Sequence, residues 1–216
     1  HTPPTGFSAL STANLPAPTV KSMDKGLVYA NAAGSSIVSD LDTAKSNAGW
    51  GSDAHIDIYQ MINGSAEGTP WVFSDDASNA LIVQTNAATT GTPSLSSSDN
   101  YMGWSLRVGA AYGCYTGLKA HVNGAGDTTQ AHGLGSGSKV GIIKMSSTTG
   151  EWIWSHPGMT TNYNMVMSDP ASVQNSTQHV AIDDTNITIK SAAASGTYRL
   201  LAFFDIPGFC FVGSGV

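Results

Sequence analysis

Short segments with strand character recur along this whole sequence, and their recurrence restricts the fold more than any other feature does. Runs rich in Val, Ile, Tyr, Phe and Trp alternate with turns of Gly, Ser and Asn, whereas helical periodicity is nearly absent. Strands at this density are typical of antiparallel sandwiches and barrels. The sequence therefore predicts an all-β fold built as a single antiparallel β-sandwich.

The clearest strand alternates strictly from His55 to Ile62, with Ile56 and Ile58 on one face and His55, Asp57, Tyr59 and Met61 on the other. The longest strand-like tract runs over Met102–Val108 and Tyr112–Val122, with a bend expected at Gly109–Ala111. The other segments predicted as strands are Gly26–Tyr29, Trp71–Phe73, Leu81–Gln84, Val140–Met145, Trp152–Ser155, Val180–Ile189 and Tyr198–Asp205.

Helices are expected at only two places. Ser36–Ser46 is the better candidate, and a turn or two within Ser168–Gln178 could start at Asp169-Pro170. Residues 1–20 carry four prolines and no apolar period, so they predict an extended arm that packs on its own body or on a neighbour. Residues 21–216 show no domain boundary and are expected to form the single sandwich, with long loops at Asn86–Asn100 and Asn123–Ser138.

Charged residues make up only 11% of the chain, and the formal net charge is -6. Nucleic-acid binding relies on clustered Lys and Arg, and the nine basic residues here are scattered singly, so no basic patch serves such a partner. The longest apolar cluster is far too short to span a bilayer. Because hydrophobic content is 41%, the chain is expected to fold rather than to be disordered.

The same shortage of charge argues against catalysis. The chain has two Glu, and its paired Asp residues lie in turn-like positions, Asp75-Asp76 and Asp183-Asp184, so no carboxyl pair suits glycoside hydrolysis. No nucleophile elbow precedes a helix. The glycine-rich run Gly133–Ser138 leads into a predicted strand and not into a helix, which favours an inter-strand loop over a phosphate loop. We expect a protein that is not an enzyme and that needs no cofactor.

A few residues keep alternative chemistry open. His1 could bind copper through its amine and ring, as in secreted copper monooxygenases, although the six His show no paired metal spacing. Cys114 and Cys210 allow one disulfide or two buried thiols. Trp152 and Trp154 lie two apart and share a strand face, which serves either a glycan-stacking platform or a sandwich core.

Two tracts resemble icosahedral jelly-roll capsid proteins of the picorna-like kind. Tyr112–Val122 resembles the aromatic segment that leads into a long capsid strand, and Gly196–Gly208 is similar to the last barrel strand, which ends near a proline. Where the family often has Arg-Gly-Ser, this chain has Thr116-Gly117-Leu118. The resemblance implies a jelly-roll-like sandwich, a polyprotein-cleaved start at His1, an arm beneath the shell and no catalytic site.

The leading hypothesis from the sequence is a non-catalytic structural subunit of a self-assembling shell, in a virion or outside the cell. Its partners would be further subunits of the same or another kind, because buried interface centres are depleted of charge. One alternative is a secreted carbohydrate-binding or copper-dependent sandwich that uses His1. Another is a surface filament or pilus subunit that is completed by strand addition.

Overall fold

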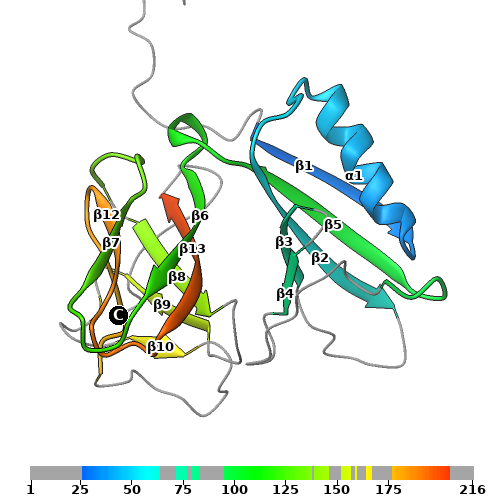
Figure 1. Cartoon of the computed structure of the whole chain (residues 1–216). Coiled ribbons are helices and arrows are strands. Elements are labelled where there is room, and N and C mark those ends of the chain that lie inside the picture. Colours follow the sequence, from blue (N-terminus) through cyan, green and yellow to red (C-terminus); the bar gives the residue numbers. More distant parts are fainter. Residues whose placement is uncertain are drawn as a thin grey trace, which may run out of the picture.

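The structure is a computed structural model that describes residues 26–63, 72–76, 79–82, 95–137, 139–145, 152–156, 159, 164–166 and 177–204. Its elements follow the chain in the order shown in Figure 1. They are β1 (Leu27–Ala33), α1 (Ser36–Asn47), β2 (His55–Asn63), β3 (Val72–Asp76), β4 (Asn79–Ile82), β5 (Asn100–Arg107), the 3-10 helix η2 (Ala110–Tyr112), β6 (Cys114–His121), β7 (Thr128–Ala131), β8 (Lys139–Met145), β9 (Trp152–Ser155), β10 (Met165–Val166), β11 (Val180–Ile182), β12 (Asn186–Ile189) and β13 (Gly196–Phe204).

The strands form three antiparallel sheets. Sheet A has the order β1-β5-β2-β3-β4, sheet B the order β10-β9-β8-β13-β6, and sheet C the order β11-β12-β7. The predicted antiparallel all-β architecture is confirmed, but the described strands form three sheets where a single sandwich would have two. Local periodicity predicts strands but not which strands pair, so it could not predict the number of sheets.

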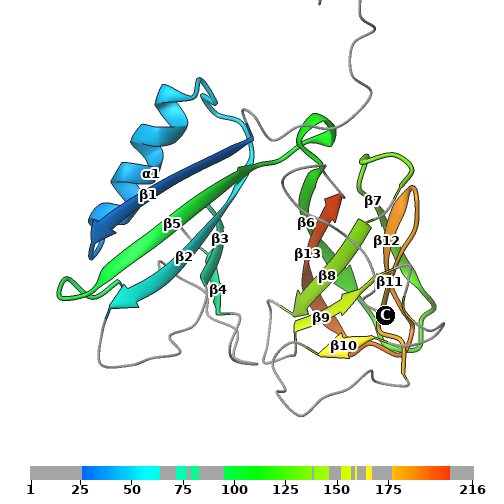
Figure 2. The ribbon, with the colours of Figure 1, turned by 180° about the vertical axis from the view of Figure 1, so that it is seen from behind.

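One face of sheet A is covered by α1 (Figures 1 and 2). Ile37, Leu41 and Lys45 follow one another at every fourth position, and all three are buried against the sheet. The helix ends at Asn47 and is capped by Ala48, and the next residue, Gly49, has a φ of 73°, a left-handed conformation that glycine adopts readily. The predicted helix over Ser36–Ser46 is therefore confirmed to within one residue.

The alternation of β2 separates two parts of the core. Tyr59 lies in the apolar cluster beneath α1, whereas Ile56 lies in a cluster on the opposite face of sheet A. That second cluster also contains Leu201 and Trp152 of sheet B, so it joins sheet A to sheet B. The two faces predicted from the sequence therefore contact different partners.

Sheets B and C pack face to face. Ile143, Ile153 and Leu200 of sheet B meet Ile187 and Ile189 of sheet C in one buried cluster. The two-sheet sandwich is thus confined to the chain from β6 onward, while α1 and sheet A lie to one side of it (Figure 2). Layers follow one another as helix, sheet A, sheet B and sheet C.

The predicted bend lies in the segment that links sheet A to sheet B. β5 runs into β6 through η2, which is flanked by Gly109 and Gly113. Gly113 has a φ of 64°, and the backbones of Gly109 and Cys114 hydrogen-bond to each other. The expected bend at Gly109–Ala111 is confirmed, because η2 separates β5 of sheet A from β6 of sheet B at this point.

Several segments differ from the predictions. The short strand β10 was not expected, and Asp75-Asp76, expected in a turn, lies at the end of β3. Asn123–Ser138 was expected to be a loop, yet it contains β7, a short strand of Thr, Gln and Ala with little apolar signal. Val180–Ile189 divides into β11 and β12 around a turn at Asp183. The predicted arm, residues 1–20, lies outside the described residues, as does nearly all of the helix candidate Ser168–Gln178. Within the described part, no helix is long and apolar enough to cross a membrane.

Candidate functional site

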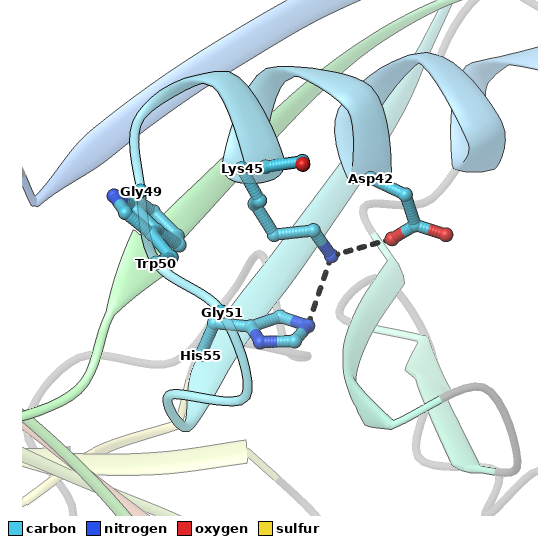
Figure 3. A pocket seen from close by; sticks show the side chains of 7 residues that line it. Asp42, Lys45, Gly49, Trp50, Gly51 and His55 are labelled. Carbon is cyan, nitrogen blue, oxygen red and sulfur yellow. Dashed lines mark hydrogen bonds and ion pairs between the residues drawn. The ribbon is translucent and has the colours of Figure 1, made fainter.

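A hollow of about 460 Å³ opens where α1 ends and β2 begins (Figure 3). The turn between these elements forms its wall, because Gly49 reverses the chain and the amide of Trp50 donates to the carbonyl of Lys45. Titratable side chains line one side of it and the Trp50 ring another (Figure 3). The lining residues are Asp42, Lys45, Ser46, Gly49, Trp50, Gly51 and His55.

The ammonium of Lys45 is the centre of the site, and its residue is only 7% exposed. Its Nζ lies 2.9 Å from Asp42 Oδ1, 3.1 Å from Asp57 Oδ2 and 2.9 Å from His55 Nε2. An ammonium has three N–H donors, and here each has one acceptor. The contacts of Lys45 therefore use all the donors of its ammonium within the network.

Asp57 lies behind Lys45 and is buried to the same degree. Its carboxylate accepts hydrogen bonds from Lys45, from the Tyr59 hydroxyl at 3.2 Å and from the fully buried Ser105 hydroxyl. Ser105 reaches it because β5 places that residue directly opposite Asp57 in the antiparallel register. Three hydrogen-bond donors therefore converge on the Asp57 carboxylate, and His55 Nε2 lies 3.6 Å from its Oδ2.

Tyr59 connects this network to the apolar cluster beneath α1, because its ring lies in that cluster and its hydroxyl donates to Asp57. Burial, the negative charge of Asp57 and the hydrogen bond to that carboxylate together raise the pKa of Tyr59 far above its ordinary value. The hydroxyl therefore keeps its proton and remains a donor. A general base would need a pKa near neutrality, so Tyr59 is excluded from that role.

His55 is fixed by contacts on both ring nitrogens. Nδ1 lies 3.0 Å from the carbonyl oxygen of Asp53, and Nε2 lies 2.9 Å from Lys45 Nζ. A carbonyl accepts and an ammonium donates, so these partners assign the proton to Nδ1 and leave Nε2 as the acceptor. In this arrangement the His55 ring is fixed at both nitrogens and holds Lys45 in place.

Arg107 forms the outer border of the site. Its guanidinium is ion-paired with Asp53 and lies over two aromatic rings, 6.0 Å from the centroid of Trp50 and 4.8 Å from that of Tyr112. Because Tyr112 belongs to η2, Arg107 connects the α1 turn to the bend between sheets A and B.

Taken together, the network binds α1 to sheet A rather than presenting reactive groups. Each titratable group of Lys45, His55 and Asp57 already has partners within the network. No group of three His, Cys, Asp or Glu among the described residues could hold a metal ion. The arrangement can therefore anchor a helix and set its position, which is a structural task.

The residues singled out from the sequence lie elsewhere. Trp152 is 1% exposed in the cluster between sheets A and B, so no sugar can stack on it as it lies, whereas Trp154 is half-buried. Cys114 is buried at the start of β6. Cys210 and His1 lie outside the described residues, as do any disulfide between the two cysteines and any copper site at His1.

The sequence analysis did not find Lys45, Asp57 or Ser105 as a site. A signal was present, because Lys45 continues the buried stripe of Ile37 and Leu41, and Asp57 lies on the same strand face as Tyr59. A cation in one apolar stripe and an anion in another can indicate a buried pair. No family model, no curated protein and no solved structure matches this chain.

Proposed function

We propose that this chain is a non-catalytic structural subunit of a self-assembling, capsid-like shell, in a virion or outside the cell. In this proposal the sandwich of sheets B and C is jelly-roll-like, and residues 1–20 form an arm that docks within the assembly. Subunits of the same or another kind are the partners.

One observation carries the proposal: large apolar side chains are exposed at the borders of the sheets. Tyr29 on the edge strand β1 is 72% exposed, and Leu118 on the edge strand β6 is 52% exposed. Val122 follows directly after β6, and Ile62 lies near the end of β2; both are exposed as well. Covering such apolar side chains with a neighbouring subunit removes them from water and so lowers the free energy of the assembly.

The candidate site supports the same conclusion. Lys45 is paired with Asp42 and Asp57, and Tyr59 donates to Asp57. The polar groups of this network therefore bond to one another inside the subunit. The low charge of the chain leaves few ionic groups that would have to be desolvated in a contact between subunits.

The native mass of the purified protein tests this proposal. Light scattering at micromolar concentration should give a mass several times that of one chain, and electron microscopy should show closed particles. A stable monomer would contradict assembly. Open fibres would contradict a shell and favour a filament subunit.

A further inference from the structure

Among the described residues, β1 is an outer strand of sheet A that pairs on one side only, with β5. Its seven residues, Leu-Val-Tyr-Ala-Asn-Ala-Ala, pair with β5 without a register shift and include no proline and no charged residue. Protein edges usually carry a charge, a proline or a bulge, or are very short, because an open edge can pair with another strand. β1 has none of these features.

The other long outer strand among the described residues, β6, does carry a charged residue. β6 carries Lys119, and its end is held against β7 by the 2.9 Å contact between His121 Nδ1 and Thr128 Oγ1. The outer strands β4, β7, β10 and β11 span four, four, two and three residues. Among these edges, β1 is the longest without a charged residue.

The hydrogen bonds at the two ends of β1 show which backbone groups point outward. Arg107 donates to the carbonyl of Gly26 at 2.8 Å, and Gly34 donates to that of Asp99 at 2.9 Å. Both pairs continue the β1–β5 register, so the backbone groups of the even-numbered residues of β1 bond to β5. The N–H and C=O groups of the odd-numbered residues face the open edge; these residues are Leu27, Tyr29, Asn31 and Ala33.

We propose that β1 pairs antiparallel with β1 of a second copy of this chain, about a two-fold axis at Ala30. This inference rests on the proposed self-assembly and names one of its contacts. In this register Tyr29 lies opposite Asn31 of the partner subunit, and Leu27 lies opposite Ala33 of the partner subunit. All seven residues are then paired, and every outward N–H and C=O of the strand finds a partner.

The position of α1 favours a second copy over an unrelated strand. The helix packs on β1 and β5, and Asp42 and Lys45 mark the flank that faces β2. The opposite flank, toward the open edge, carries the short residues Asp40, Ala44 and Asn47. With each helix axis midway between its own β1 and β5, a strand spacing of about 4.8 Å would place the two axes about 10 Å apart, which is the spacing of packed helices. The dimer would thus pair the helices as well as the strands.

A matched pair of proline variants tests the contact. Asn31→Pro removes one outward N–H of β1 and should leave the β5 ladder intact. Ala120→Pro removes one outward N–H of β6, because Phe204 bonds to Gly113 and sets odd-numbered residues toward β13. We expect Asn31→Pro to lower the native mass at least twofold, while Ala120→Pro keeps the wild-type mass and both keep the wild-type circular dichroism.

The outcomes separate the two proposals. If the wild type assembles and Asn31→Pro assembles equally well, the β1 contact is overturned and the proposed function stands. A monomeric wild type overturns both. If Asn31→Pro fails to fold, cysteine cross-linking decides the question: a mixture of Tyr29→Cys and Asn31→Cys proteins should cross-link faster than either alone. Equal rates, or cross-links to any other segment in peptide mass spectra, overturn the register.

Discussion

At the scale of single residues, the ion pair between Lys45 and Asp57 lies in the interior of this weakly charged protein. Lys45 and Asp57 are both 7% exposed, and each is held by further polar partners. Burying two charges costs desolvation free energy that good geometry can offset, while a single charge left behind remains uncompensated. The pair therefore fixes where α1 lies more than it adds to stability.

Lys45→Met should destabilise the fold strongly, because Asp57 would keep its burial and lose its counter-ion. We expect a loss of about 3–5 kcal/mol in the free energy of unfolding, measured by urea denaturation. The matched control is Lys190→Met, which breaks a partly exposed ion pair with Asp127 and should cost about 0–1 kcal/mol. Equal losses in the two variants would contradict the structural role of Lys45.

Tyr59 should make stability fall at high pH. Its pKa is raised in the folded state, so its contribution is present below the ordinary tyrosine pKa of 10.0 and is lost as the pH rises above it. At pH 8, Tyr59→Phe should be less stable than the wild type by about 1.5 kcal/mol, because a hydrogen bond to a charged group is lost. Urea denaturation at pH 11 should show a smaller gap; an unchanged gap would show that Tyr59 ionises normally.

At the scale of elements, the close approach of α1 to sheet A depends on Gly103. A Cβ at this position on β5 would lie 2.6 Å from Leu41 Cδ1 and 3.1 Å from Ile37 Cγ1. Helix and strand were both predicted from local patterns, but the sequence does not show that Gly103 lies beneath Leu41. That contact arises only when β5 takes its place between β1 and β2.

Gly103→Ala should cost about 1–3 kcal/mol by overpacking. Leu41→Ala alone should cost about 2–5 kcal/mol through the cavity it leaves. In the double variant the new methyl group occupies part of that cavity, so the combined loss should be smaller than the sum of the single losses. Thermal and urea unfolding of the three variants measure this coupling, and strict additivity would show that the two side chains do not meet.

At the scale of the whole molecule, the layers formed by the described residues pair β1 on one side only, with β5. The apolar clusters under α1, between sheets A and B, and between sheets B and C contain most of the large side chains that are buried in the described part of the chain, although Leu134 and Trp50 are buried outside them. None of these clusters covers Tyr29 or Leu118. The self-association tested by native mass and by Asn31→Pro belongs to this scale, because it depends on which sheet edges the fold leaves unpaired.

The sequence by itself determined the strand-rich class, the helix at Ser36, the bend after Arg107 and the two faces of β2, because each depends on neighbours a few residues apart. It did not determine the three sheets, the strand β7 or the Lys45–Asp57 pair. Strand order joins residues far apart in the chain, as β1 pairs with β5 and β6 with β13, and no local period encodes those pairings. Tertiary structure alone decided which polar residues are buried together and which edge stays open.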